Sequence, residues 1–157
     1  MAGSSGKNMK KNIVAPRGYY FRVVKGIYGG WSVKLYKRKI GEIGHINLVR
    51  VYTGCYATHS HLDNKFHNKG LGALLYAKAI QWGIKHGYRI RSSGGSSRDA
   101  QRVWRGSTLK RWFDIKVKPG IDYYSKNPDP NRDTFYPRLK ETKCRARSKK
   151  VNVKRRK

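Results

Sequence analysis

The sequence predicts a mixed α/β fold in which a series of antiparallel strands precedes a parallel strand–helix–strand unit. Short stretches between residues 19 and 62 alternate apolar and polar residues and are separated by glycines, as in half-buried strands. The spacing becomes helical over residues 71–86, and alternation returns immediately afterwards. A strand that leads through a helix to another strand of the same sheet normally forms a parallel, right-handed crossover. The length of 157 residues favours a single domain.

Three or four antiparallel strands are expected before the helix. The pattern is clearest in residues 31–36, where Trp31, Val33 and Leu35 share one face. Similar stretches cover residues 19–24, 43–52 and 55–62.

The helix expected at residues 71–86 has its polar residues Lys78, Gln81 and Lys85 on one stripe. Apolar residues fill most of the remainder, so we expect this helix to be largely buried against the sheet. Residues 88–92 alternate again and predict the strand that closes the parallel unit.

A second helix and a further strand follow. Ser96, with Asp99 three positions later, resembles a capping box and predicts a helix that begins there and runs to about residue 110. The last expected strand lies near residues 113–117.

Charge divides the chain into a body and two basic ends. The sequence has 37 Lys and Arg against 8 Asp and Glu, a formal net charge of +29. Residues 138–157 hold eleven of the basic residues and one Glu, and residues 1–12 are rich in Gly and Lys. We therefore expect a flexible basic segment at residues 1–12, one folded domain at residues 13–137 and a basic tail at residues 138–157.

Membrane, secreted and disulfide-bonded classes are not indicated. No apolar run approaches the roughly 20 residues of a membrane-spanning helix, and the first residues lack the apolar centre of a secretory signal. Cys55 and Cys144 lie far apart, one in an apolar segment and one in the basic tail, so both are expected to be free thiols. These patterns predict a soluble intracellular protein.

Residues 62–72 (Leu-Asp-Asn-Lys-Phe-His-Asn-Lys-Gly-Leu-Gly) stand between an expected strand and the buried helix. Gly70 and Gly72 at a helix entrance allow backbone N–H groups to approach a ligand closely, and a helix N-terminus attracts anions. The segment could thus hold a phosphate, although a glycine pair before a helix is often only a tight turn. It lacks the Gly-Lys-Ser/Thr of a nucleotide P-loop.

This segment resembles the central motif of the GCN5-related N-acetyltransferases (GNAT), whose fold is that of the acyl-CoA N-acyltransferases. The positions that match the motif in register are Leu62, Phe66, Gly70, Leu71 and Gly72. The resemblance continues through residues 96–104, which look like the second helix of the family, with Ala100 and Val103 at small and apolar positions.

The resemblance implies an enzyme that binds acetyl-CoA and transfers the acetyl group to an amine. By position, the backbone near His61, Leu62 and Asp63 would hold the pantetheine arm. The amides that would hold the diphosphate belong to Asn68, Lys69, Gly70, Leu71, Gly72 and Ala73.

The chain also departs from the family pattern. His67 stands where the family has Arg or Gln, Asn64 replaces a Pro, and Trp104 replaces a tyrosine that protonates the leaving thiolate in many members. Nor does the strand before the motif carry the Glu that serves as a base there.

His59 and His61 are the candidate catalytic residues, because an imidazole could accept the amine proton through a water at neutral pH. Both would share one face of a strand, and the alternative is two histidines on a solvated strand face. Cys55, His59, His61 and His67 could also bind zinc, but their spacing matches no common zinc finger, so no metal is expected.

The positive charge predicts an affinity for nucleic acid or another polyanion. The tail residues expected to contact phosphates are Arg145, Arg147, Lys149, Lys150, Lys154, Arg155, Arg156 and Lys157. The aromatic residues at 19–21 and at 123–124 could stack on bases, but such residues are more often core or sheet residues.

Two functions therefore stand. One is an N-acetyltransferase for an acidic or nucleic-acid-associated acceptor, which the glycines of residues 62–72 favour. The other is an inactive protein of the same fold that binds DNA or RNA in a ribosomal or phage particle, which Trp104 and the missing Glu favour. The sequence identifies neither the acceptor nor the oligomeric state.

Overall fold

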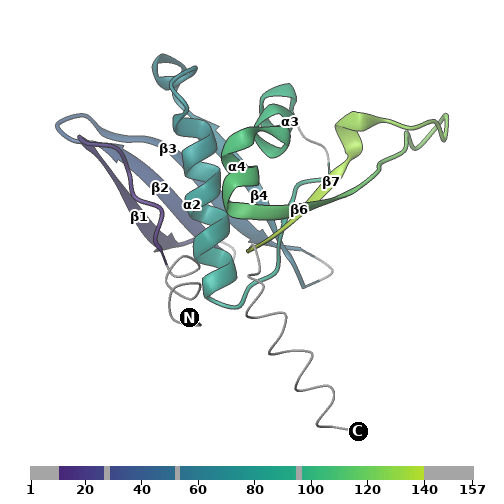
Figure 1. The fold of residues 1–157 in the computed structure, drawn as a ribbon, viewed down its shortest axis with the longest axis horizontal. Helices are drawn as coiled ribbons and strands as arrows, with labels where there is room; N and C mark the ends of the chain where they lie inside the picture. The colour runs from purple at the N-terminus through teal and green to yellow at the C-terminus, as the bar shows by residue number, and fades with distance from the viewer. Residues whose placement is uncertain (1–10, 27–28, 52–53, 95–96, 140–157) are drawn as a thin grey trace, which may run out of the picture.

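The computed structural model describes residues 11–26, 29–51, 54–94 and 97–139. The main sheet has five strands, in the order β1 (Tyr19–Lys25), β2 (Trp31–Lys37), β3 (Gly41–Arg50), β4 (Tyr56–Leu62) and β5 (Ile90–Ser92). The helices are α2 (Leu71–Lys85), α3 (Arg98–Arg105) and α4 (Ser107–Trp112), with short 3-10 turns η1 (Asn64–Phe66) and η2 (Pro130–Arg132). A separate two-stranded sheet consists of β6 (Phe113–Lys118) and β7 (Thr134–Leu139) (Figure 1).

The predicted fold class is confirmed. β1 to β4 pair as consecutive antiparallel neighbours, whereas β4 and β5 are parallel and are connected through α2. The expected helix at residues 71–86 corresponds to α2, and the strand expected at residues 88–92 is the shorter β5. Within the described residues, no helix is long and apolar enough to cross a membrane.

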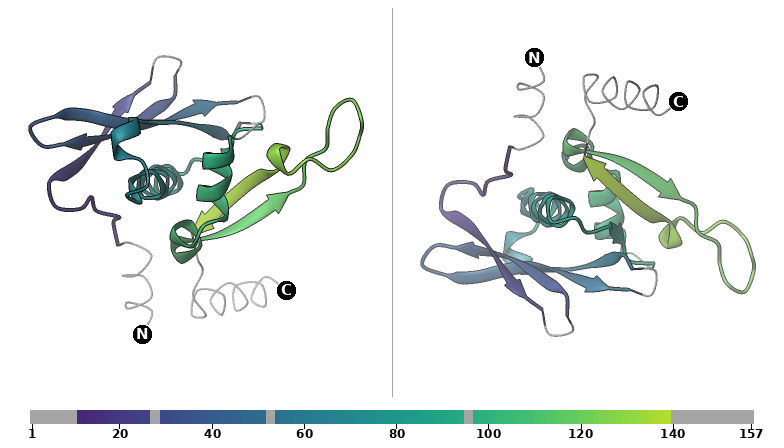
Figure 2. Two further views of the ribbon diagram at one scale, coloured as in Figure 1. Left: turned by 90° about the horizontal axis from the view of Figure 1, so that it is seen from above. Right: turned by 90° about the horizontal axis from the view of Figure 1, so that it is seen from below.

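The helices and the small sheet all lie on one side of the main sheet (Figure 2). Alternation along the strands directs Val33, Leu35, Ile46 and Leu48 toward α2, and these side chains are fully buried in the core. No described element covers the opposite face of the sheet, here called the open face.

Close packing joins α2 to β5. A Cβ atom added to Gly83 of α2 would lie 2.5 Å from Cδ1 of Ile90, so the absence of a side chain lets the helix approach the strand. The buried side chain of Gln81, two residues before Gly83, accepts a hydrogen bond from the backbone N–H of Ile13 at 2.8 Å and donates to the carbonyl of Lys11 at 2.7 Å. This amide ties the start of the described chain to α2.

The second predicted helix is wrong in two respects. Its N-cap is Ser97 and not Ser96, because the Ser97 hydroxyl accepts a hydrogen bond from the N–H of Ala100. Ser96 itself lies outside the described residues. The helix is also interrupted at Gly106, whose backbone is extended and serves as the N-cap of α4.

The strand expected near residues 113–117 is present as β6 but does not join the main sheet. It pairs with β7, which the sequence did not predict. The hairpin and its connecting loop, residues 113–139, are here called the arm, and Figure 1 shows them extending away from the helices. Phe135 anchors the arm by stacking on the buried Trp104, with ring centroids 5.6 Å apart. β7 continues to Leu139, past the expected domain boundary at residue 137.

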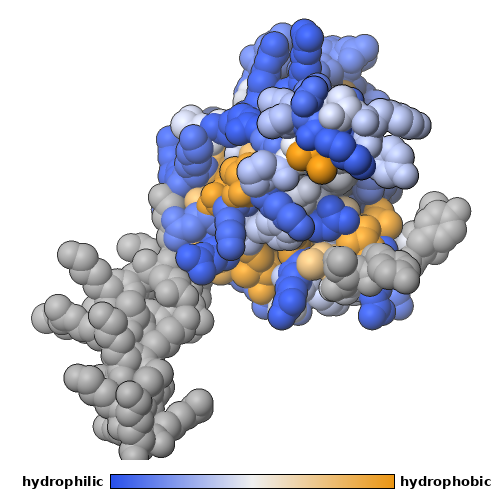
Figure 3. Space-filling view, turned by 90° about the vertical axis from the view of Figure 1, so that its right-hand side faces the viewer, coloured by the Kyte–Doolittle hydropathy of each residue, from blue (hydrophilic) through white to orange (hydrophobic). Residues whose placement is uncertain are grey.

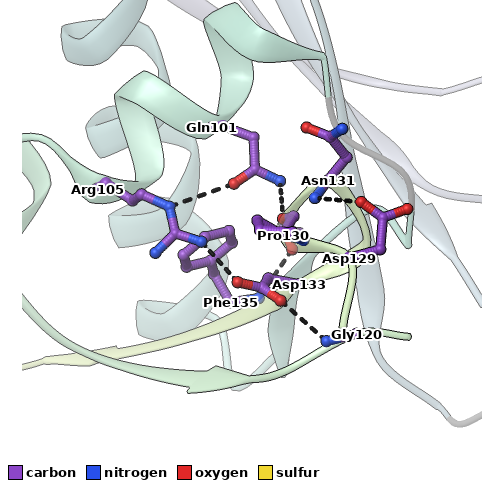
Figure 4. A network of polar contacts seen from close by, with 9 residues as sticks. Gln101, Arg105, Gly120, Asp129, Pro130, Asn131, Asp133 and Phe135 are labelled. Atoms are coloured by element: carbon purple, nitrogen blue, oxygen red, sulfur yellow. Dashed lines mark hydrogen bonds and ion pairs between the residues drawn. The ribbon is translucent and has the colours of Figure 1, made fainter. Parts of the chain in front are cut away.

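A polar network also joins the arm to α3 (Figure 4). The Asp133 carboxylate accepts hydrogen bonds from the Arg105 guanidinium at 2.6 Å and from the N–H of Gly120 at 2.9 Å. Gln101 donates to the carbonyl of Pro130 at 2.8 Å. The Gly120 hydrogen bond, with a smaller contribution from Arg105, holds the pKa of Asp133 below the ordinary value of an aspartate.

Replacing this carboxylate tests the network. Because folding lowers the pKa of Asp133, the carboxylate stabilises the fold above about pH 4, and that contribution is lost as the pH falls through the lowered pKa. Asp133→Asn should therefore lower the free energy of unfolding by about 1–2 kcal/mol near neutral pH, with a smaller difference from wild type in strong acid. Urea unfolding at about pH 6.5 and about pH 2.5 measures both differences.

Asp99→Asn is the matched control, because the exposed Asp99 carboxylate lies 3.8 Å from Arg102 on the protein surface and should contribute little at either pH. An effect of Asp133→Asn that is the same at both pH values would contradict a role for its charge.

Candidate functional site

The parallel strands β4 and β5 separate after a short contact. Their paired residues are Tyr56 with Ile90, Ala57 with Arg91 and Thr58 with Ser92. The rest of β4, from His59 to Leu62, pairs with β3 on one side but has no β5 partner on the other. The backbone groups along that edge are therefore available to a ligand that lies between the two strands.

The segment that follows β4 is held in place by Phe66 and His67. Phe66 is buried in the core, and the ammonium groups of Lys37 and Lys69 lie 5.5 and 5.6 Å from its ring centroid. His67 Nε2 donates a hydrogen bond to the carbonyl of Leu62 at 2.7 Å. The imidazole at this position thus braces the segment against the end of β4.

The entrance to α2 has the backbone shape of an anion-binding turn. Asn68 and Gly70 both adopt left-handed conformations, with φ of 62° and 75°. Gly70 is the N-cap of α2, and no side chain of the described residues caps the helix there. The first N–H groups of the helix have no acceptor within the helix, so they can donate to an anion.

On the side that faces α2, β4 carries two hydroxyl groups at the point where β5 diverges. Thr58 is 2% exposed, and its Oγ1 has no hydrogen-bond partner among the described residues. Ser60 lies two residues further on, and its Oγ is 2.8 Å from the Tyr76 hydroxyl of α2. Burial raises the pKa of Tyr76, and the hydrogen bond from Ser60 lowers it to a smaller extent. Tyr76 therefore stays protonated at neutral pH.

The aromatic ring beside Tyr76 is Trp104. It is almost fully buried, contacts the Tyr76 ring edge-on at a centroid distance of 5.7 Å and stacks on Phe135. Trp104 is thus part of the core, and the hydroxyl closest to it in this aromatic cluster belongs to Tyr76.

His59 and His61 project from the other face of β4, the open face, because side chains alternate along a strand. Both are exposed, and His61 Nε2 lies 3.1 Å from the Asp63 carboxylate. On the neighbouring strand His45 is the register partner of His61, and the two ring centroids are 5.7 Å apart. The Glu42 carboxylate lies 3.6 Å from His45 Nδ1, so titratable groups continue from β4 onto β3.

A cavity of about 310 Å³ opens on the same face, over β1, β2 and β3. Its lining includes the apolar Trp31 and Val49 and the polar Lys34, Glu42 and His45. His45 therefore lies between this cavity and His61.

The structure brings the predicted cofactor residues to one place. His61, Leu62 and Asp63 are at the end of β4, and residues 68–73 form the adjoining turn and first turn of α2. The predicted nucleic-acid contacts of the tail lie outside the described residues, as does Cys144. Cys55 is a free cysteine. Among the described residues, no three His, Cys, Asp or Glu side chains gather in a way that could hold a metal ion.

Sequence reasoning missed Ser60, Tyr76, His45 and Glu42. Tyr76 falls within the apolar stripe of α2, where a tyrosine is most simply interpreted as core. Its hydrogen-bond partner, Ser60 of β4, can be identified only once α2 is packed against the sheet. The pairing of His45 with His61 depends on the register of β3 and β4, which a single sequence does not specify.

Comparisons with known proteins give matches in structure alone. No protein-family profile matches the sequence, and no curated protein matches it. A GNAT-family acetyltransferase from Streptococcus pneumoniae has a TM-score of 0.45 at 16% identity, over 71% of this chain and 67% of that one. A ribosomal-protein alanine acetyltransferase from Vibrio fischeri has a TM-score of 0.46 at 14% identity, over 70% and 61%.

A third match is the acetyl transferase from Salmonella typhimurium that modifies the N-terminal serine of a protein of the 50S ribosomal subunit. Its TM-score is 0.49 at 12% identity, over 71% of this chain and 64% of that one. The chain thus spans about two thirds of the length of these proteins. The similar solved structures include acetyltransferases of the GNAT family, and the likeness concerns the fold.

Two glycines test the backbone shape of the turn. Gly70→Ala should lower the free energy of unfolding by about 1–2 kcal/mol, because φ at this position is 75° and an L side chain there is strained. Gly72 lies inside α2, and a Cβ there would meet only Leu62 Cδ2, at 3.8 Å. Gly72→Ala should therefore be neutral or stabilising by up to about 1 kcal/mol. Urea unfolding measures the free energy of unfolding of both variants. Equal changes in Gly70→Ala and Gly72→Ala would contradict the left-handed turn at Gly70.

Proposed function

We propose that the protein is an acetyl-CoA-dependent N-acetyltransferase whose acceptor is an amine on an acidic or nucleic-acid-associated molecule. The observation that carries this proposal is the edge of β4 from His59 to Leu62, which β5 leaves unpaired beside the uncapped N-terminus of α2. An extended amide-containing chain that ends in a diphosphate suits this combination, because its amides pair with strand backbone and its phosphates bind helix amides.

The residues present fit such a ligand. The amides of residues 68–73 would bind the diphosphate, and Lys69 would add positive charge next to it. The backbone of His61, Leu62 and Asp63 would hold the pantetheine arm. Thr58 supplies a further argument, because its buried hydroxyl has no hydrogen-bond partner among the described residues and stands where β5 begins to diverge, next to the proposed ligand.

Alternation along β4 places different chemistry on the two sides of this edge. A thioester bound there would supply an activated acetyl carbon, which the acceptor amine attacks with formation of a C–N bond and cleavage of the C–S bond. His59 or His61 would accept the amine proton on the open face, directly or through water. The Tyr76 hydroxyl, held by Ser60, would donate a proton to the departing sulfur on the side that faces α2.

The open face offers a route for the acceptor. The cavity of about 310 Å³ over β1 to β3 lies one residue, His45, away from His61. Lys25 and Lys34 line it together with Glu42, so an acceptor with acidic groups beside its amine would find complementary charges. The large positive charge of the chain would recruit the same kind of molecule.

Binding is tested first, without any assumption about the acceptor. At about 1 mM and raised salt, acetyl-CoA should raise the midpoint of thermal unfolding by several degrees, since a ligand at 100 times its Kd stabilises by about 2.7 kcal/mol. Ala73→Glu should abolish this shift, because it places a carboxylate in the first turn of α2 where the diphosphate would bind. The same carboxylate favours helix formation, so the free variant should stay as stable as wild type.

Ala73→Gln is the matched control and should keep most of the shift. Absence of any shift in the wild-type protein would contradict the proposal and leave the alternative of an inactive nucleic-acid-binding protein of this fold.

Variants of the two faces of β4 test the chemistry. Tyr76→Phe should lower kcat by about 100-fold while the acetyl-CoA-induced thermal shift is retained, because only the proton donor is lost. The joint replacement His59→Ala and His61→Ala should also lower kcat, because the proposed proton acceptor is lost. Acetyl transfer to a panel of amines, measured by release of free thiol, gives these rates.

The controls are Tyr88→Phe, whose hydroxyl accepts a hydrogen bond from Trp31 at 3.2 Å, and His86→Ala, whose ring stacks on Trp82. Neither side chain belongs to the proposed site, so turnover should persist in both. Unchanged turnover of the double histidine variant would exclude a histidine base, and unchanged turnover of Tyr76→Phe would exclude that acid.

A further inference from the structure

The tip of the arm exposes aromatic residues that the fold does not use. Tyr124 is 87% exposed and Tyr123 is 68% exposed, and their rings meet edge-on with centroids 5.2 Å apart. Ile121 near the tip and Val117 on β6 are also exposed. Large apolar residues exposed in this number on one projecting element are typical of a binding surface.

The tip is a closed turn. The Asp122 carboxylate accepts hydrogen bonds from the N–H of Tyr124 and from the Ser125 hydroxyl, at 3.1 and 3.0 Å. The backbone N–H of Asp122 donates to the carbonyl of Asn127 at 2.8 Å, and Ile121 forms a bridge with Pro128. These contacts hold the two tyrosines in a defined outward position, which lowers the entropy cost of binding through them.

Three of the four carboxylates of the arm are occupied by internal contacts, whereas the fourth, Asp114 at the start of β6, is exposed and is the register partner of Arg138. The Asp122 carboxylate accepts the hydrogen bonds from Tyr124 and Ser125 within the turn, and these bonds hold its pKa below the ordinary value of an aspartate. Asp133 is bound by Arg105 and Gly120, and Asp129 accepts the N–H of Asn131 and lies 3.3 Å from Arg132. These three acids serve the internal structure of the arm and of its junction with α3.

On the outer face of the hairpin, cations lie around one aromatic ring, that of Tyr136. Lys116 is the register partner of Tyr136, and Lys118 follows two residues later on the same face. Arg138 follows Tyr136 by the same spacing on β7, and both lysines and Arg138 are exposed. At the tip, Lys126 Nζ lies 4.7 Å from the centroid of the Tyr123 ring. Figure 3 views the molecule from the side of the arm and shows hydrophilic residues over most of this surface, with apolar patches between them.

We propose that the arm binds single-stranded nucleic acid, with bases stacked on Tyr123 and Tyr124 and phosphates bound by Lys116, Lys118 and Lys126. Exposed rings next to cations suit this ligand because every base has a face for stacking and every nucleotide carries a phosphate. A duplex would offer only phosphates, since its bases are already stacked. The net charge of +29 favours a polyanion over a typical protein partner.

The test separates base stacking from charge. Fluorescence anisotropy measures binding of wild-type protein to a labelled oligouridylate and to an abasic oligomer of the same length and charge, over a range of salt concentrations. The joint replacement Tyr123→Ala and Tyr124→Ala should weaken binding of oligouridylate about tenfold or more, with no change for the abasic oligomer and the same dependence on salt. The joint replacement Lys118→Ala and Lys126→Ala should weaken both and flatten the salt dependence.

Tyr20→Ala is the matched control, because Tyr20 is an exposed tyrosine on the open face that stacks on Tyr36. It should leave both affinities unchanged. Equal affinities of wild type and the double tyrosine variant for oligouridylate would overturn the proposal, as would an equal loss on the abasic oligomer. Because no acetyl-CoA is present, these results do not depend on the proposed acetyl transfer.

Discussion

The unpaired edge of β4 is the constraint on which the candidate site depends. Backbone N–H and C=O groups of a strand need partners, and β5 provides them only as far as Thr58. β4 continues to Leu62 without a β5 partner, and the chain then turns through η1, where Phe66 is buried in the core. The result is a strand edge and a helix N-terminus that meet at one point, each with hydrogen-bonding groups that a ligand can satisfy.

The same strand separates two kinds of side chain. Because residues alternate along β4, Thr58 and Ser60 face α2 whereas His59 and His61 face the open side. A group bound at the edge would therefore have imidazoles on one side and hydroxyl groups on the other. This separation follows from the pleat of the strand and needs no special loop.

Local patterns were sufficient for the elements that build this geometry. The alternation at residues 31–36 and the helical spacing at 71–86 predicted β2 and α2, and the glycines marked the turn between β4 and α2. Long-range pairing was not predictable in the same way. β7 contains Pro137 and follows a loop rich in Pro and Asp, so its sequence does not have the alternation of a strand. The predicted N-cap of α3 was wrong by one residue, because the adjacent Ser96 and Ser97 are equally suitable as caps by residue type.

In the candidate site, too, the local features could be predicted from the sequence and the long-range contacts could not. The backbone that would hold the cofactor is contiguous in sequence, so a motif could identify it. The hydroxyl of Tyr76 reaches Ser60 across the interface between helix and sheet, and His45 reaches His61 across two strands. Such contacts depend on packing and register, which a single sequence does not specify.

The glycine at position 83 has a consequence for the opposite end of its helix. Its contact with Ile90 sets how near α2 lies to the start of β5, where the two parallel strands still touch. α2 is one stiff element, so that near approach at its C-terminal end also constrains how its N-terminal end lies beside β4. The space next to the edge of β4 that β5 leaves free therefore depends on a close contact several turns away along the helix.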